Sequence, residues 1–166
     1  MAKLCLMIGV PGSGKSTFAK NHLLNITYIS RDEIRFSLIS DEDEYFAKEY
    51  EVFALYVQKI REGLMRGETV VADSTNLNEA ARKKLFNAIG NKQFYEKYKV
   101  EKTFIYMDIP LTVCRVQNLL RTGRAVVPDR VIDSMYQKLE YPTKEEGFTR
   151  GLIVHEGEDA EWVMFL

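Results

Sequence analysis

The chain has 166 residues, and its 23 Lys and Arg residues nearly balance its 24 Asp and Glu residues, giving a formal net charge of −1. Its composition, 46% hydrophobic and 28% charged, is typical of one globular domain and excludes disordered and collagen-like chains. So small a net charge also excludes a surface that coats duplex DNA by counterion release, but it is compatible with a local basic pocket.

The two cysteines, Cys5 and Cys114, belong to no paired motif, and the two histidines, His22 and His155, lie far apart in the sequence. Neither a disulfide scaffold nor a zinc site is therefore expected. The longest early apolar run covers residues 4–8, whereas a membrane span needs about 18 residues. That run leads directly into a glycine loop, which a signal peptide does not, so we expect a reduced, soluble chain in the cytoplasm.

Apolar and polar stretches alternate along the first half of the chain in the manner of strands and helices. After a strand at 4–8, buried on both faces, we predict a loop at 9–14, a helix at 15–24, a strand at 26–29 and a helix at 31–39. The clearest helix is predicted at 44–66, where apolar residues recur in steps of 4, 3, 4, 3 and 4. The core face of that helix would consist of Phe46, Tyr50, Phe53, Val57, Ile60 and Leu64.

The second half of the chain continues this alternation. We predict strands at 69–72, 103–107 and 152–154, helices at 78–89, about 111–120 and about 132–139, a polar turn at 91–99 and a basic loop at 121–128. Residues 162–166 carry no clear pattern, and an added strand and a packed tail are the two alternatives for them. Alternating strands and helices predict an α/β fold, with a parallel sheet of about five strands covered by helices on both faces. We expect one domain over 1–166.

Residues 9–16 match the Walker A pattern G-x-x-x-x-G-K-[ST] between a predicted strand and a predicted helix. Glycines let successive backbone N–H groups approach an anion, and the helix N-terminus adds partial positive charge. Lys15 is expected to reach the β- and γ-phosphates of ATP or another nucleoside triphosphate, and the Ser16 hydroxyl to bind Mg²⁺. The expected donor contacts are Gly12, Ser13, Gly14, Lys15, Ser16 and Thr17. The alternative is a glycine-rich turn with a surface lysine.

Charged residues follow the second predicted strand, at the sheet edge where α/β proteins bind ligands. Asp32 and Arg35 are three residues apart, so both can face one side of a helix start. Asp32 could accept a proton from an attacking hydroxyl, and Arg35 could hold a substrate phosphate. The alternative is a solvated charge run in which Asp32 is only an acid at the helix start.

Asp73 ends the third predicted strand, where an acid beside a phosphate loop often holds Mg²⁺ or its water. A capping acid is the alternative. Arg121 and Arg124 lie in the predicted basic loop, and such arginines can close over a nucleotide and stabilise charge on a moving phosphoryl group. The alternative for both arginines is a solvated loop.

Together these motifs resemble the kinase domain of the polynucleotide 5′-hydroxyl kinase family, which includes a bacteriophage end-healing enzyme. The matching stretches, between residue 4 and about residue 140, are 9–17, 31–35, 73–78, 121–128 and 133–136. Many NTPases share the phosphate loop, so it does not distinguish this family from others. The Asp32/Arg35 pair and the stretch at 73–78 make the resemblance to the polynucleotide kinase family more specific. The resemblance implies that Asp32 is the general base for the 5′-hydroxyl and that Arg35 holds the phosphate 3′ of the terminal nucleoside.

The resemblance also implies that Asp73 lies beside the metal and phosphates and that Arg121 is the lid arginine acting on the transferred phosphate. The loop at 121–128 is one residue longer than in the phage pattern, so Arg121 and Arg124 compete for that role. Gln117 occupies a position at which members of this family commonly have an arginine. No phosphatase domain follows the kinase motifs, so we expect no removal of 3′-phosphates.

The sequence thus predicts an ATP- and Mg²⁺-dependent kinase that acts on the 5′-hydroxyl end of DNA or RNA, grips only the strand terminus and binds no membrane. One alternative is a small-molecule kinase for a nucleoside, sugar or amino-acid derivative, since the same scaffold supports both. Another is a nucleotide-binding regulatory or toxin-like module. The intact Lys15, Ser16 and Asp32 argue against that last class.

Overall fold

The computed structural model describes residues 1–166, with the side chain of Glu158 outside the description. Its strands are β1 (Lys3–Ile8), β2 (Thr27–Ser30), β3 (Thr69–Asp73), β4 (Glu101–Asp108), β5 (Arg150–His155) and β6 (Ala160–Met164). Its helices are α1 (Lys15–His22), α2 (Arg31–Leu38), α3 (Glu49–Met65), α4 (Glu79–Ile89), α5 (Lys92–Lys97), α6 (Leu111–Leu119) and α7 (Asp129–Gln137). Short 3₁₀ turns lie at Gly123–Ala125, Lys144–Glu146 and Glu156–Glu158. Within these described residues, no helix has the length and apolar character needed to cross a membrane.

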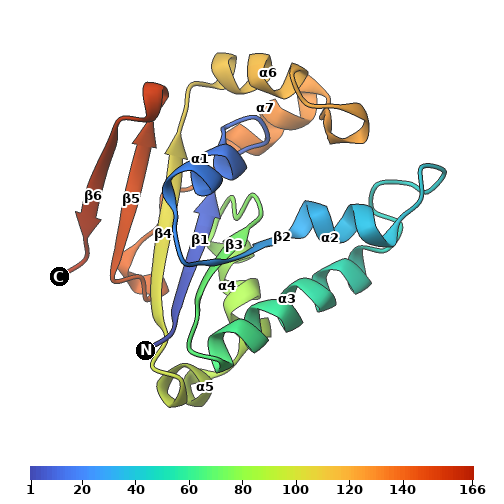
Figure 1. Ribbon diagram of the computed structural model, residues 1–166. Coiled ribbons are helices and arrows are strands. Elements are labelled where there is room, and N and C mark those ends of the chain that lie inside the picture. The colour runs from blue at the N-terminus through green and yellow to red at the C-terminus, as the bar shows by residue number, and fades with distance from the viewer.

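The strands form one sheet in the order β2-β3-β1-β4-β5-β6 (Figure 1). Neighbours from β2 to β5 pair in parallel, and β6 pairs with β5 in the antiparallel direction. The predicted α/β fold with about five parallel strands is confirmed. Strand β6 adds an antiparallel edge, and it includes part of the C-terminal stretch that carries no clear sequence pattern.

Helices cover both faces of the sheet, as the side chains of the central strand β1 show. Successive side chains of a strand point to opposite faces. Leu4, Leu6 and Ile8 pack in one core cluster with buried residues of α3, α4 and α5. Cys5 and Met7 pack in a second cluster with buried residues of α1, α6 and α7. The continuous apolar run of β1 is therefore explained by burial on both sides.

Helix α3 begins at Glu49, later than the predicted start at residue 44. Phe46 and Tyr50, predicted as core residues, are 64% and 85% exposed. Val52 and Tyr56, which the predicted face omits, are buried instead. The prediction was wrong here because regular apolar spacing cannot show whether an aromatic ring packs on the sheet or, as Phe46 does, beside an arginine of α2.

Residues 91–99, predicted as a polar turn, contain the short helix α5. The Asn91 side chain caps this helix by accepting a hydrogen bond from the backbone N–H of Phe94 at 3.0 Å. Phe94 itself is buried against the core. The polar composition of this segment does not predict a helix. The helix is stabilised by one capping side chain and one buried aromatic residue, which leave no periodic apolar pattern.

The carboxyl ends of β1, β2 and β3 meet at one edge of the sheet. The register pairs Asp73 of β3 with Met7 of β1 on one side and with Ser30 of β2 on the other. The glycine loop follows β1, and α2 begins directly after β2. Figure 1 shows α2, α3 and the segment between them extending beyond the β2 edge of the sheet. The topology therefore gathers the motif residues at one place.

Candidate active site

The glycine loop links β1 to α1, as its sequence pattern predicts. Gly12 and Gly14 have φ angles of 81° and 88°, in the left-handed region that favours glycine. Space also requires glycine at residue 12, because a Cβ atom there would lie 2.1 Å from the carbonyl oxygen of Cys114 in α6. The loop is therefore shaped by its own backbone and by close packing against α6.

Lys15 is the first residue of α1, and its ammonium group folds back over the loop. It donates hydrogen bonds to the carbonyl oxygens of Gly9 and Val10 at 2.9 and 3.1 Å. Burial lowers the pKa of Lys15, whereas the carboxylates of Asp73 and Asp32 act to raise it. Lys15 of α1, Asp32 of α2 and Asp73 of β3 line the same cavity, so the motifs that follow or end β1, β2 and β3 converge.

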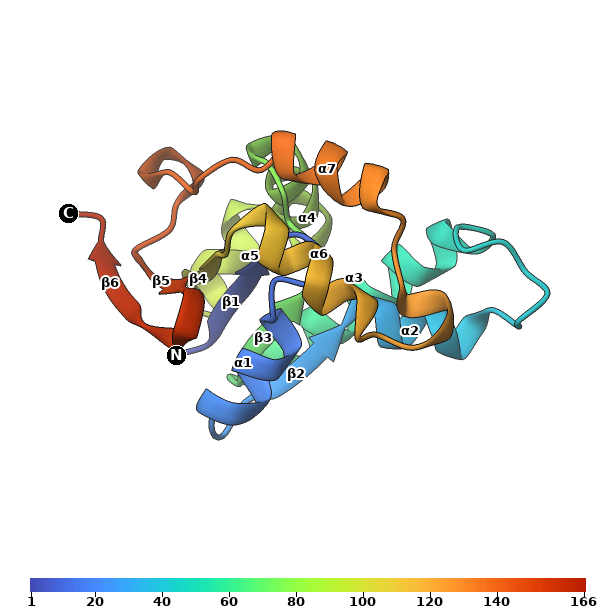
Figure 2. The same ribbon diagram turned by 90° about the horizontal axis from the view of Figure 1, so that it is seen from above.

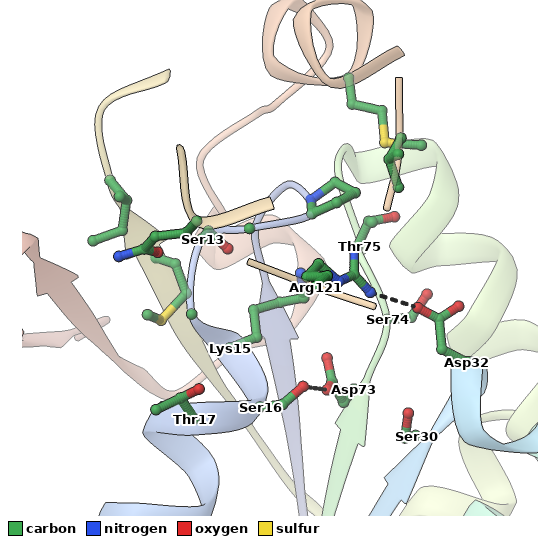
Figure 3. A pocket seen from close by; sticks show the side chains of 18 of the residues that line it. Ser13, Lys15, Ser16, Thr17, Ser30, Asp32, Asp73, Ser74, Thr75 and Arg121 are labelled. Atoms are coloured by element: carbon green, nitrogen blue, oxygen red, sulfur yellow. Dashed lines mark hydrogen bonds and ion pairs between the residues drawn. The ribbon is translucent and has the colours of Figure 1, made fainter. Parts of the chain in front are cut away.

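Ser16 and Asp73 face each other across the site (Figure 3). The Ser16 hydroxyl donates a hydrogen bond to Oδ2 of Asp73 at 2.9 Å, and the Tyr28 hydroxyl donates to the same oxygen. Burial, together with the charge of Asp73, raises the pKa of Tyr28, so this phenol stays a donor. Hydroxyl and carboxylate oxygens are ligands that Mg²⁺ prefers, so the pair fits the predicted ion. The described residues hold no cluster of three His, Cys, Asp or Glu ligands, so phosphate oxygens and water would complete the coordination.

Asp32 lies in the first turn of α2, and its two carboxylate oxygens have different surroundings. Oδ1 accepts hydrogen bonds from the Tyr45 hydroxyl and from Nη1 of Arg35, both at 2.7 Å. Oδ2 lies 3.5 Å from Nη2 of Arg121 (Figure 3). The Asp32 side chain is 42% exposed. One oxygen is thus held by the protein, and the carboxylate remains within reach of a substrate.

Arg35 is buried, and its terminal nitrogens bind other side chains of the protein. Besides Asp32, Nη1 donates to the Tyr45 hydroxyl at 3.0 Å, and Nη2 donates to Glu49 at 2.5 Å. Glu49 also accepts a hydrogen bond from Arg31. Arg35 therefore supports Asp32 in this structure. Its role as a holder of the substrate phosphate stays a prediction, and the buried Nε of Arg35, which has no hydrogen-bond partner, is the donor that a phosphate could use.

The basic loop at 121–128 joins α6 to α7 and is fastened at its base by Asn118. The fully buried side chain of Asn118 donates to the carbonyl oxygen of Val127 at 2.7 Å and accepts from its backbone N–H at 3.0 Å. An amide side chain that makes both bonds to the backbone of one residue fixes where the loop returns. Figure 2 shows the loop lying over α2.

The two candidate lid arginines have different partners. Arg121 lies beside Oδ2 of Asp32. Arg124 instead donates hydrogen bonds to the backbone carbonyls of Ser40 and Asp43, in the segment between α2 and α3. Arg121 is therefore placed among the acidic side chains of the site, whereas Arg124 fastens the loop to a neighbouring segment.

A cavity of about 1010 Å³ opens over the glycine loop and α2. It brings together all the predicted site residues, namely Gly12, Ser13, Gly14, Lys15, Ser16, Thr17, Asp32, Arg35, Asp73, Arg121 and Arg124. Sequence reasoning missed Tyr28, Tyr45, Phe46 and Glu49. Strand alternation places Tyr28 on the same face as Ser30, the pairing partner of Asp73, so this contact could have been inferred. No motif marks the other three.

Residues 4–142 match the model of the AAA_33 family, described as an AAA domain. The chain belongs to this family. The match covers the glycine loop, Asp32, Asp73 and the two candidate lid arginines, and two curated relatives reported below are kinases by name. The chain is accordingly a P-loop kinase domain.

The similar proteins act on different substrates according to their names. L-seryl-tRNA(Sec) kinase of Methanococcus maripaludis is 29% identical over 143 residues, which are 84% of this chain and 53% of that protein. A putative bifunctional polynucleotide kinase/RNA ligase of Autographa californica nuclear polyhedrosis virus is 24% identical over 153 residues, 82% of this chain and 20% of that protein. A sugar kinase from Janibacter sp. HTCC2649 has a TM-score of 0.64 and 17% identity, covering 93% of this chain and 86% of that chain. This AAA_33 domain thus spans about half, or less, of the length of these two curated relatives.

Proposed function

We propose that this domain transfers the γ-phosphate of ATP to the 5′-hydroxyl at an end of DNA or RNA. The arrangement of Asp32 carries the proposal. Tyr45 and Arg35 hold its Oδ1, and Oδ2 stays available beside Arg121 in the cavity. A carboxylate fixed by one oxygen and reachable at the other is suited to take the proton of an attacking hydroxyl.

The remaining side chains have complementary roles in this proposal. Lys15 neutralises the β- and γ-phosphates, and Ser16 and Asp73 would hold Mg²⁺, which when bound offsets charge on those phosphates. The 5′-oxygen forms a bond to the γ-phosphorus while the bond from that phosphorus to the β,γ-bridging oxygen breaks, and ADP leaves. The proton of the hydroxyl passes to Oδ2 of Asp32. Arg121 stabilises charge on the transferred group.

The name of one curated relative favours a nucleic-acid end over a small metabolite. The viral relative is named a polynucleotide kinase/RNA ligase, and its similarity covers 82% of this chain. The near-zero net charge is compatible with a grip on a strand terminus rather than on a long phosphate track. The alternative is a kinase for a small hydroxyl compound, and the fold shared with a sugar kinase supports it.

The test is a comparison of acceptors under saturating ATP. Transfer of labelled γ-phosphate is measured to a 5′-hydroxyl DNA oligonucleotide, the same RNA sequence, a nucleoside, a sugar and seryl-tRNA. We expect one or both oligonucleotides to be the preferred acceptor. Asp32→Asn should lower kcat for that acceptor by about 10²–10⁴ while ATP binding is retained.

Glu33→Gln is the matched control, because Glu33 is an exposed acid in the same first turn of α2. If Asp32 acts only as a helix-start acid, the two variants should have equally small effects. Transfer to the sugar or to seryl-tRNA without transfer to either oligonucleotide would contradict the proposal and establish the alternative.

A further inference from the structure

Three aromatic side chains stand beside Asp32, and the proposed chemistry leaves two of them without a role. Phe36 of α2, Tyr45 and Phe46 line the cavity, and we call them the aromatic wall. Tyr45 is at its centre, with ring centroids 6.1 Å from Phe36 and 4.7 Å from Phe46. The Tyr45 hydroxyl binds Asp32 at 2.7 Å. The wall therefore begins at the proposed general base and extends outward from it.

The aromatic wall is held in place before any ligand arrives. The guanidinium carbon of Arg35 lies 4.4 Å from the ring centroid of Tyr45 and 5.5 Å from that of Phe46. Glu49 fixes Arg35 from the other side, through a hydrogen bond of 2.5 Å. The Tyr45 and Phe46 rings meet edge to face at 87°. A preorganised ring loses little conformational freedom on binding, which favours affinity.

Phe46 is the most exposed member of the wall. It is 64% exposed although it lines a cavity whose other lining groups include Lys15, Asp73 and Arg121. It lies outside the core clusters formed by the described residues. A rigid, accessible ring face beside charged groups is suited to a ligand that has both a flat apolar surface and a phosphate or hydroxyl. A nucleotide is such a ligand, because every base has a face that stacks on aromatic rings.

We propose that the aromatic wall is the subsite for the acceptor's terminal nucleobase, with Phe46 stacking on the base of the nucleotide whose 5′-hydroxyl meets Asp32. This inference rests on the proposed function and adds to it a basis for choosing nucleic acid over sugars. Stacking reads the face of a base and not its hydrogen-bonding edge, so the subsite is tolerant of sequence. It requires that the terminal base be accessible, which favours a single-stranded or overhanging end over a blunt duplex end.

The experiment compares two acceptors that differ only in the terminal base. One is a single-stranded 5′-hydroxyl oligonucleotide with a 5′-terminal adenosine, and the other has an abasic residue at that position. Base–aromatic stacking predicts that the wild-type kcat/KM is roughly 5- to 150-fold higher for the acceptor with the base. Phe46→Ala should remove most of that preference, and Phe46→Trp should keep it.

The abasic acceptor is the internal control for the position of Asp32, because its rate should not change in Phe46→Ala. Tyr50→Ala is the matched variant, since Tyr50 is an exposed aromatic residue on nearby α3 that does not line the cavity. It should behave as wild type with both acceptors. An equal loss for both acceptors in Phe46→Ala overturns the base subsite while leaving the proposed function standing. Failure of the wild type to phosphorylate any oligonucleotide overturns the proposed function, and the base subsite with it.

Discussion

The ammonium group of Lys15 is surrounded by groups that affect its charge in opposite directions. Burial lowers its pKa and is the largest influence, Asp73 and Asp32 act to raise the pKa, and Arg121 acts to lower it. Triphosphate oxygens near this ammonium would add negative charge and raise the pKa again. The affinity of the site for a nucleotide is therefore linked to the protonation of a single lysine.

This linkage predicts proton uptake when ATP binds under alkaline conditions. Between the lowered pKa of Lys15 in the free protein and its higher pKa in the complex, free Lys15 is partly neutral and must gain a proton on binding. Below that lowered pKa free Lys15 is already charged, so its proton uptake should decrease as the pH falls. Calorimetric titrations in two buffers of different ionisation enthalpy, at neutral and alkaline pH, measure the number of protons.

Lys20→Ala supplies the control, because Lys20 is an exposed lysine of the same helix. The alkaline uptake should persist in Lys20→Ala and be lost in Lys15→Ala at protein concentrations that still give binding. Uptake that does not depend on pH would contradict the assignment of this proton to Lys15.

At the scale of elements, the loop between α6 and α7 connects the donor and acceptor sides of the cavity. Arg121 lies beside the proposed general base, and Arg124 bonds to the segment that also carries Tyr45 and Phe46. Asn118 holds the base of the loop. The loop can therefore influence the acceptor in two separable ways.

Alanine variants of the two arginines should separate these effects. Arg121→Ala should lower kcat by about 10²–10³ with little change in the KM for ATP, because its charge acts on the transferred group. Arg124→Ala should raise the KM for the acceptor by about 3- to 10-fold, since the aromatic wall loses hydrogen bonds that anchor its segment. Steady-state kinetics with each substrate varied in turn gives kcat and both KM values. A raised KM for ATP in Arg124→Ala would show instead that Arg124 contacts the donor.

The aromatic wall of the site could not be predicted from the sequence, whereas the phosphate-binding side could. The glycine loop, Asp32 and Asp73 could be assigned because each has a fixed position relative to a strand, and parallel strands bring such positions together. Phe46 carries no such mark, and its regular spacing assigns it to the core face of a helix that begins only at Glu49. Strand β6 is hidden for a related reason, since its register pairs Met164 with Arg150 through contacts that local pattern does not contain.

At the scale of the whole molecule, Arg82 joins segments that are distant in the sequence. Its guanidinium is fully buried and donates to both carboxylate oxygens of Glu146, at 2.6 and 2.8 Å. It also donates to the backbone carbonyls of Asn76 and Glu140 at 3.0 and 3.1 Å. This cluster connects α4 to the segment between α7 and β5.

Glu146→Gln should destabilise the fold by about 3–5 kcal/mol, because it leaves a buried guanidinium without its counter-charge. For a chain of this size that corresponds to a decrease in Tm of roughly 10 °C, measured by thermal denaturation. Glu145→Gln, at the exposed neighbouring position, should change the free energy of unfolding by about 0.5 kcal/mol or less. Neither residue lines the cavity, so both variants should retain activity below their melting temperatures. Equal stability of the two variants would show that the buried pair contributes little.

The close approach of the glycine loop to α6 has a consequence for how inactive variants of this protein are interpreted. A methyl group at residue 12 would collide with the carbonyl oxygen of Cys114 and lie 3.0 Å from the backbone nitrogen of Asn118, the residue that fastens the basic loop. Gly12→Ala would therefore have two effects. It would damage phosphate binding, and it would displace α6, the helix from which the basic loop departs. Lys15→Ala removes a charge at the end of a side chain and leaves that packing intact, so it is the cleaner catalytically inactive reference for genetic complementation.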